Sequence, residues 1–356
     1  MKILDWYILK RYLFTFLMML LLFIPIGITV NLAEKIDKIL AQEVPFVAVA
    51  QYYLDFTIYF ANLLYPIFLF ISVIWFTSKL ANNTEVVAFL SSGVSFWRFL
   101  RPYMIGATLV ASLALIMGLY LAPNASKGFN EFKYTYLKKN AKLTQTTNIY
   151  RQINDNDYIY VSNFNPVSKR GSNFTLEHFE GNQLTYKISA TSIVDQDSTY
   201  RLINYTKRIF GVDNDSIETS RRKDIAFEFD TDDLTPEAYI AETLQYGDLI
   251  DFIEKEKRRG SSNIGRYEVV KHKKWSLPVS VFILTIIAVS VSSIKRRGGM
   301  GINLAFGITI AMIFVFFDKV FSVLAAQSSF SPIVAVWLPN VVFGILAAYL
   351  LFNAKR

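Results

Sequence analysis

Residues 84–93 read TEVVAFLSSG and connect two long apolar stretches of the chain. Thr84 is placed to cap a short helix, Glu85 lies at its positive end, and Gly93 suits the position after its last turn. The apolar residues of this helix fall on one face: Val86, Val87, Phe89 and Leu90. At 1.5 Å per residue the helix covers about 13 Å, which is too short for a bilayer core of about 30 Å. We expect it to lie on a membrane surface, either as a plain interfacial helix or as a docking helix for a cytoplasmic partner.

The composition places this helix in a membrane protein with a substantial polar portion. Of the 356 residues 53% are hydrophobic, and the mean hydropathy is +0.30, which is too apolar for a soluble protein. Six segments reach the length of roughly 20 apolar residues that a membrane helix needs: 12–32, 56–76, 102–122, 277–294, 302–326 and 333–352. The first apolar run is too long for a cleavable signal peptide, so we expect it to remain as a span.

Clusters of Lys and Arg predict the orientation of these spans. They occur at the N-terminus, in the connection 77–101, in the connection 295–301 and at the C-terminus. Since short cytoplasmic loops carry the excess of Lys and Arg, we expect both termini in the cytoplasm and the long segment 123–274 outside. This gives three parts: residues 1–122 with spans one to three and the surface helix 84–93, an outer domain at 123–274, and residues 275–356 with spans four to six.

The outer segment differs from the rest of the chain in its polar, alternating pattern. Residues 154–164, 172–179, 184–194, 200–211 and 223–230 have the period of short strands, and EGNQ at 180–183 predicts a hairpin turn. Several strands at this spacing predict a sandwich or an open barrel. From about Thr235 the pattern becomes helical, with Pro236 in the first turn and Gly260 at the end.

A basic run precedes the fourth span and opposes the predicted orientation. Eight Lys or Arg and two Glu lie between Lys255 and Lys274. A solvated charge run needs no special explanation, but basic groups at an outer membrane surface also bind phosphorylated lipid headgroups. We therefore name Lys271, Lys273 and Lys274 as candidate contacts for a lipid phosphate.

The sequence offers few residues for catalysis. It has no GxxxxGK[ST] phosphate loop and no GxSxG motif, and its two histidines, His178 and His272, lack metal-site spacing. The absence of cysteine excludes disulfides and thiolate metal sites. We expect no catalytic residue, no metal and no cofactor bound by this chain.

Charged residues occur near the outer ends of two predicted spans. Asp318 and Lys319 interrupt the fifth span about 24 Å along the helix from Ile302, in the outer third of the bilayer, where charges usually face protein or a water-filled cavity. The first span ends near the same level, with Glu34, Lys35, Asp37 and Lys38. Snorkelling to the interface explains the lysines equally well; the alternative is that both spans line one polar-rimmed opening.

Four stretches in this order resemble the LptF/LptG (YjgP/YjgQ) family of lipopolysaccharide export permeases. They are LDWYILKRYL at 4–13, TEVVAFLSSGVS at 84–95 with the later APN at 122–124, RRGGMGINLAFGI at 296–308 and SPIVAVWLPN at 331–340. The resemblance covers nearly the whole chain, and LDWYI is closer to the LptG member. The fold class it implies is an α-helical membrane protein with six transmembrane helices and an inserted periplasmic β-jellyroll-like domain.

The resemblance also implies a function. Family members form an LptF–LptG heterodimer in the inner membrane, bind an LptB ATPase dimer below and LptC at the side, and pass lipopolysaccharide from the outer leaflet to a periplasmic bridge. ATP is used by the partner subunit. The connection between spans two and three is the family's coupling helix, whose acidic residue matches Glu85, and spans one and five form lateral gates. Lys38 is nearest to the family's lipid-phosphate contacts on span one.

Two other classes of function remain open. An ion-gradient-driven transporter would show internal repeats and charges near the midplane, and we find neither. A membrane-anchored envelope scaffold would leave the surface helix and Asp318 without a role. We expect lipopolysaccharide and membrane lipids, but no nucleic acid, among the partners, and copurification of an ATPase separates the three classes.

Overall fold

The computed structural model describes residues 3–137, 147–165, 168–196, 199–211, 214–227, 229, 239–261, 263–294, 299–327 and 330–354. They belong to two compact units, which we describe one by one. The first comprises Met1–Asn140, Ala241–Leu249 and Gly265–Arg356, and the second Ala141–Ile240 and Ile250–Ile264.

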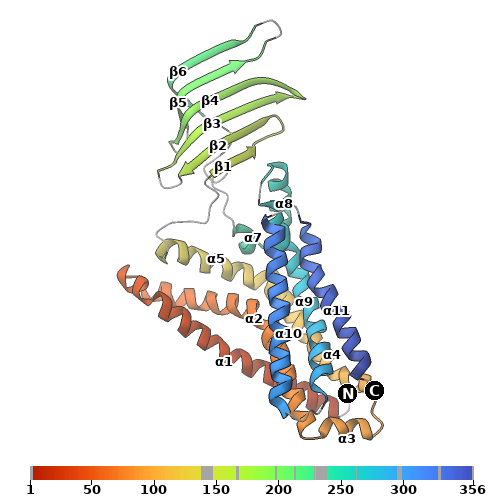
Figure 1. Ribbon diagram of the computed structural model, residues 1–356. Helices are drawn as coiled ribbons and strands as arrows, with labels where there is room; N and C mark the ends of the chain where they lie inside the picture. Colours follow the sequence, from red (N-terminus) through yellow and green to blue (C-terminus); the bar gives the residue numbers. More distant parts are fainter. Residues whose placement is uncertain are drawn as a thin grey trace. The chain divides into compact units, whose positions relative to one another are not determined.

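Six helices of the described chain are long and apolar enough to cross a membrane, as the sequence predicts. They are α1 (Ile3–Ala41), α2 (Phe46–Asn82), the continuous run Phe96–Leu137, α9 (Ile264–Ser292), α10 (Gly299–Gln327) and α11 (Pro332–Ala354) (Figure 1). Several extend beyond their apolar segments. α1, for example, continues through the charged EKIDK sequence to Ala41, because no residue there interrupts the helix before the turn that leads to Pro45.

The third membrane helix is built from four pieces. α4 (Phe96–Ile116) passes through a π-helical turn, η1 (Met117–Leu121), into α5 (Ala122–Phe132) and a second π-helical turn, η2 (Lys133–Leu137). Pro123 lies just after η1, and the widened π-helical turn accommodates a proline that lacks a backbone N–H. The helix therefore continues past Pro123, the residue at which the sequence pattern becomes polar.

The core of the first unit collects around α9. Val281, Leu284 and Ile287 of α9 are at most 1% exposed and belong to one cluster with Leu69 and Val73 of α2. α1 contributes to the same cluster only through its first half, and α10 and α11 add Phe314 and Phe343. α9 is the most buried of the six membrane helices within this chain.

The second unit contains one antiparallel sheet whose strands follow one another in chain order. The strands are β1 (Thr147–Gln152), β2 (Asp157–Asn165), β3 (Arg170–Glu180), β4 (Gln183–Asp195), β5 (Tyr200–Ile209) and β6 (Ser216–Ile225). One face is apolar and buried, through pairs such as Val161 opposite Phe174 and Leu176 opposite Ile188. The inserted β domain and the predicted hairpin, whose turn places Gly181 at φ +62, are thereby confirmed.

The strand predicted at residues 223–230 is wrong in its position. The sixth strand is the more polar SIETSRRKDI, which ends at Ile225. Phe227 and Phe229 follow outside the strand, stack on each other with ring centroids 5.0 Å apart, and pack against the sheet core. A strand at a sheet edge can keep polar side chains in solvent on both faces, which explains why its apolar alternation is weak. β1 was also not predicted from the sequence.

The helical segment after the sheet consists of two helices. α7 (Ile240–Thr243) and α8 (Tyr246–Arg258) replace the single helix expected from Thr235 to Gly260, whose predicted start at Pro236 lies outside the described residues. Within the second unit, the end of α8 is joined to β1 by a buried ion pair between Arg151 and Glu256 at 2.8 Å. The backbone N–H of Gln152 also donates to the carbonyl of Arg259.

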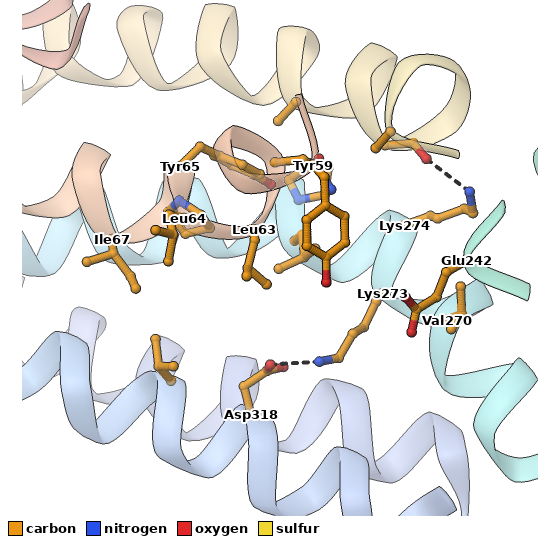
Figure 2. Close-up of a pocket in the computed structure, with 18 of the residues that line it drawn as sticks. Tyr59, Leu63, Leu64, Tyr65, Ile67, Glu242, Val270, Lys273, Lys274 and Asp318 are labelled. Atoms are coloured by element: carbon orange, nitrogen blue, oxygen red, sulfur yellow. Dashed lines mark hydrogen bonds and ion pairs between the residues drawn. The ribbon is translucent and has the colours of Figure 1, made fainter. Parts of the chain in front are cut away.

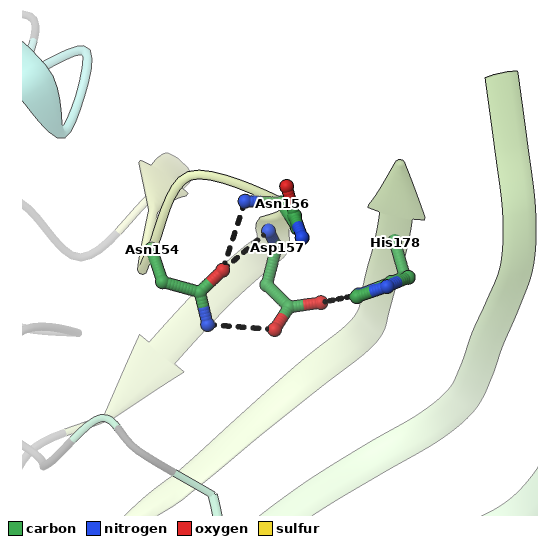
Figure 3. Close-up of polar contacts among 4 residues, drawn as sticks. All are labelled: Asn154, Asn156, Asp157 and His178. Atoms are coloured by element: carbon green, nitrogen blue, oxygen red, sulfur yellow. Dashed lines mark hydrogen bonds and ion pairs between the residues drawn. The ribbon is translucent and has the colours of Figure 1, made fainter. Parts of the chain in front are cut away.

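The turn between β1 and β2 is held by polar side chains (Figure 3). The amide oxygen of Asn154 accepts from the backbone N–H groups of Asn156 and Asp157, and its amide nitrogen donates to Asp157 Oδ2 at 2.8 Å. The other carboxylate oxygen of Asp157 lies 2.6 Å from Nδ1 of His178 on β3. His178 therefore joins β3 to the start of β2 within the sheet. No group of metal-binding side chains forms among the described residues.

Candidate functional site

The connection between α2 and α4 contains α3 (Glu85–Ser91), at the position predicted for the surface helix. Gly93 follows it with φ +82, in the left-handed conformation expected after the last turn. The predicted side-chain cap by Thr84 is wrong. Thr84 has φ +63, and its hydroxyl donates to the carbonyl of Asn83 instead of accepting from the helix.

Glu85 is half-buried and held from two sides. The amide of Asn83 donates to its Oε1 at 3.2 Å, and the hydroxyl of Tyr7 on α1 donates to its Oε2 at 3.4 Å. A carboxylate in the first turn also lies at the positive end of the helix. The structure thus connects the acidic residue of α3 to the first turns of α1, a contact across 78 residues of sequence that no local pattern indicates.

The prediction that the apolar residues of α3 form one face is wrong, because they divide between a covered and an exposed side. Val86 is 1% exposed and belongs to the core, and the ring of Phe89 lies 6.0 Å from that of Phe99 on α4. Val87 and Leu90, in contrast, are 52% and 38% exposed. One side of α3 is therefore fixed to the helical unit, and the other presents apolar side chains to a neighbour.

A cavity of about 330 Å³ lies within the first unit among α2, the α4–α5 helix, α7, α9 and α10 (Figure 2). Its walls are mostly apolar. Residues from each of these elements line it, among them Tyr59, Leu63, Tyr65, Gly118, Glu242, Lys273, Lys274, Leu277, Phe314, Asp318 and Lys319.

The charged residues predicted at the ends of the fourth and fifth helices meet in this cavity. Lys273 donates to Asp318 Oδ2 at 2.7 Å and thereby joins α9 to α10 (Figure 2). Lys274 is 8% exposed and donates to two backbone carbonyls, of Gly118 at 3.0 Å and of Leu244 at 3.3 Å. With Lys319 the lining has three cationic groups against two carboxylates, so it favours an anion. Lys271 does not line the cavity.

One polar group of the cavity lining lacks a partner. Tyr65 on α2 is 5% exposed, and its hydroxyl has no hydrogen-bond partner within the described part of the chain. Buried hydroxyls are usually satisfied; this oxygen is itself buried, so it is an unsatisfied group within the wall and is not exposed to the cavity. Tyr59, Tyr65 and Glu242 were not predicted. Their proximity to the lysines depends on the packing of α2 and α7 against α9, which sequence spacing does not reveal.

The charged residues at the end of α1 form a separate group. Lys35 donates to the hydroxyl of Tyr52 on α2 at 2.9 Å, and that hydroxyl donates to Asn31 at 3.1 Å. The ammonium group also lies 5.8 Å from the ring centroid of Phe129 on α5. Glu34, Asp37 and Lys38 are exposed. None of the four α1 residues lines the cavity that contains Asp318.

The arrangement suits the binding of an amphiphile. The cavity has apolar walls, which suit a hydrocarbon portion, and a surplus of cationic groups, which suits an anionic head, while one side of α3 is exposed and apolar. Nothing in this part of the molecule resembles a nucleophile held by a general base.

The family model described as lipopolysaccharide export system permease LptF/LptG matches residues 6–353, nearly the whole chain. A comparison with curated proteins finds no match.

Proposed function

Because the chain belongs to the LptF/LptG family of lipopolysaccharide export permeases, we propose that it extracts lipopolysaccharide from the outer leaflet of the inner membrane. A separate ATPase drives the step, and the lipid passes to a periplasmic bridge towards the outer membrane. The chain has no ATP site of its own, binds no cofactor or metal, and works as a transport subunit. The observation that carries this proposal is α3, which is fixed to the helical unit on one side and apolar and exposed on the other.

In this proposal both termini and α3 face the cytoplasm, and the β domain is periplasmic. The clusters of Lys and Arg near the N-terminus, between α2 and α4, between α9 and α10 and at the C-terminus support this orientation. α3 then lies where a cytoplasmic ATPase dimer of the LptB type can reach it. Val87 and Leu90 enter the groove of the ATPase, and Glu85 orients the helix.

The lipid path involves α1 and α10, the helices of the proposed lateral gates. The apolar cavity with Asp318 and Lys319 accepts part of the lipid, and the surplus of cationic groups attracts its phosphates. Lys35 and Lys38 extend this path along α1, while Glu34 marks its rim. Lys273 and Lys274 contribute positive charge from inside the cavity, and Lys271 does so from outside it.

The proposed assembly contains a paralogous LptF/LptG-type permease and an LptC-type jellyroll protein. The exposed apolar length of α1 supports a second permease, since side chains such as Leu21 and Leu22 are more than half exposed in this chain. Membrane lipids cover whatever the partner leaves free.

The proposal is tested by purification of the chain from bacterial membranes in mild detergent. Glu85→Lys reverses the charge at the start of α3, opposes the helix dipole and removes both hydrogen bonds to residue 85. The matched control is Glu43→Lys, which makes the same charge change at an exposed residue in the connection between α1 and α2. The measurements are the ATPase subunit that copurifies, ATP hydrolysis and release of lipopolysaccharide from vesicles.

We expect the wild type and Glu43→Lys to retain the ATPase and Glu85→Lys to lose it. If wild-type preparations contain no ATPase even after crosslinking in cells, the proposal fails in favour of a gradient-driven transporter or a scaffold. If all three retain it with equal hydrolysis and lipid release, α3 is only an interfacial helix.

A further inference from the structure

α1 is attached to α4 at its first turns, and its far half contacts α2. Its buried residues are Asp5, Ile8, Leu9, Tyr12 and Phe16, followed only by Ile39 near the far end. The long apolar middle is mostly exposed, with Leu17, Leu21, Ile26 and Val30 each at least half exposed. Beyond Phe16 the covered side of α1 packs on α2, with Phe23 stacked on Phe68, Gly27 close to Phe60 and Lys35 bonded to Tyr52. The far half of α1 can therefore swing about its held first turns together with the part of α2 that it contacts.

The held end contains a bidentate ion pair. Arg98 in the first turn of α4 donates from its two terminal nitrogens to the two carboxylate oxygens of Asp5, both at 2.7 Å. The Asp5 side chain is 9% exposed and that of Arg98 29%. Two parallel hydrogen bonds between a guanidinium and a carboxylate fix orientation as well as distance, so α1 cannot rotate or slide at this point without breaking the pair.

α3 contacts both partners of this pair through their neighbours. On α1, Tyr7 lies two residues after Asp5 and donates to Glu85. On α4, Phe99 follows Arg98 and contacts Phe89 of α3. A displacement of α3 therefore acts on the start of α1 and the start of α4 together, and the Asp5–Arg98 pair makes these two helix ends move as one body.

The first turns of α1 also pack tightly against α4 beyond the ion pair. A Cβ atom added at Gly106 of α4 would lie 2.2 Å from Cε1 of Tyr12 and 3.1 Å from Cδ1 of Leu9. This close approach gives α1 a fulcrum about two turns from Asp5. The ion pair lies between this contact and the N-terminal end of α1, and the exposed apolar part of α1 lies on the other, longer side of the contact.

We propose that Asp5 is a positioning residue that transmits the movement of α3 to the gate helix α1. Through its bidentate ion pair with Arg98, Asp5 couples a displacement of α3 by the ATPase to a movement of the far part of α1. This movement opens or closes the lipid path. The inference rests on the proposed function, because it requires an ATPase on α3. It goes beyond it by assigning the coupling to a pair of residues outside α3 and outside the lipid path.

The experiment uses the assembled complex and pairs of spin labels. The chain has no cysteine, so Leu21→Cys on α1 and Ile345→Cys on α11, both exposed, place labels on this subunit only at these two positions. A reference pair, Val279→Cys on α9 with Ile345→Cys, reports on the helices that we expect to stay fixed. Distances are measured without nucleotide and with ATP trapped by vanadate, in the wild type, in Asp5→Asn and in the charge-swapped Asp5→Arg/Arg98→Asp.

We expect the 21–345 distance to change on ATP trapping in the wild type and the 279–345 distance to stay constant. Asp5→Asn should reduce the change at 21–345 and lower the lipid released per ATP hydrolysed about fivefold, within the range found for residues on coupling paths. ATPase retention and hydrolysis should stay near wild type, and the charge swap should recover both readouts in part. A purely structural Asp5 would instead lower complex yield, hydrolysis and release together.

Two results would overturn the inference while the proposed function stands: a full 21–345 change in Asp5→Asn, or a wild type that hydrolyses ATP and releases lipid without that change. A wild type that never binds an ATPase refutes the proposed function itself. Should Asp5→Asn fail to assemble, Arg98→Lys provides the same test, since it keeps the charge and removes the bidentate geometry.

Discussion

α1 and α9 are both long helices with a strongly apolar stretch, but they relate to their own chain in opposite ways. In the most apolar 18 residues of α9, 67% are buried within the chain, and in those of α1 only 6%. Hydropathy therefore does not distinguish a helix at the centre of the unit from one at its margin. The difference lies in the kind of side chain each helix offers to its neighbours.

α9 has several small residues among its buried positions, whereas the apolar stretch of α1 has mostly bulky ones, with a close contact to α2 at Gly27. Ser276, Ser280, Ala288, Ser290 and Ser292 of α9 are buried, and small side chains let helices approach closely in a membrane. The corresponding region of α1 reads FTFLMMLLLF at 14–23. Its side chains are bulky, and about half of them, such as Leu17 and Leu21, are exposed. Residue size therefore separates these two helices better than hydropathy does.

The largest effect that tests this contrast is the change in stability when one leucine of each helix is replaced by alanine. Leu284 of α9 is 1% exposed, so Leu284→Ala should leave a cavity and destabilise the folded chain by about 2–5 kcal/mol. Leu21→Ala on α1 removes the same atoms from a side chain that is 59% exposed and should change stability by less than about 0.5 kcal/mol. Thermal unfolding of the isolated chain in detergent measures both, and similar losses in the two variants would contradict the contrast.

A smaller effect tests how α1 is anchored. Gly106→Ala places a Cβ atom 2.2 Å from the ring of Tyr12, which must shift, and should destabilise the chain by about 1–3 kcal/mol. Gly118→Ala is the matched control on the same membrane helix, because its Cβ would meet nothing within 4 Å. In that open position alanine should be neutral or stabilising by up to about 1 kcal/mol, owing to its higher helix propensity.

The two glycine variants are compared by the same unfolding measurement and by the accessibility of a cysteine placed at Ile8, which is 3% exposed and belongs to the core cluster beside Leu9. Gly106→Ala should expose Ile8→Cys to a thiol reagent and Gly118→Ala should not. Equal stability and equal labelling would show that the first turns of α1 are not held by close packing against α4.

Much of the fold could be predicted because it follows from length and period. Six apolar stretches of span length predicted six membrane helices, and alternation in the polar insert predicted the β domain. The α3 helix was recognisable from its acid, its apolar residues and Gly93. The continuation of the third helix past Pro123 could not be predicted, because a proline at the point where the sequence becomes polar usually marks the end of a helix. The π-helical turn that accommodates this proline leaves no clear local signal in the sequence.

The candidate site was predictable only as separate residues. Asp318 and Lys273 could each be noticed as charges in or beside apolar sequence, but their ion pair joins positions 45 residues apart. The expectation that Asp318 and the charged end of α1 line one opening finds no shared contact in the structure, where Lys35 bonds to Tyr52 instead. The fork between Asp5 and Arg98 spans 93 residues, and neither residue is unusual in its own sequence surroundings. Such pairs depend on tertiary packing, which single-sequence patterns do not encode.

The smallest effect that we predict concerns ion pairs, and it compares an exposed pair with a partly buried one. Arg201 on β5 donates two hydrogen bonds to Asp224 on β6, and the two side chains are 38% and 45% exposed. The hydrogen bonds from Arg201 lower the pKa of Asp224 from its ordinary value. A lowered pKa in the folded state means that the pair stabilises the fold at pH values above the unfolded pKa of about 3.9. This stabilisation is lost as the pH falls through the lower folded pKa.

Asp224→Asn should therefore lower the unfolding temperature slightly at pH 7 and not at all well below the folded pKa, where the wild-type carboxyl is protonated as well. High salt should shrink the difference at pH 7, because solvent and ions screen an exposed pair. Asp318→Asn, which leaves Lys273 without its carboxylate beside an apolar cavity, should cost more than Asp224→Asn at pH 7 and respond less to salt. If the two variants lost equal stability with equal salt dependence, the partial burial of the Lys273–Asp318 pair in the helical unit would not make it more stabilising than the exposed pair. The contrast between the buried and the exposed parts of this permease would then hold for apolar packing alone.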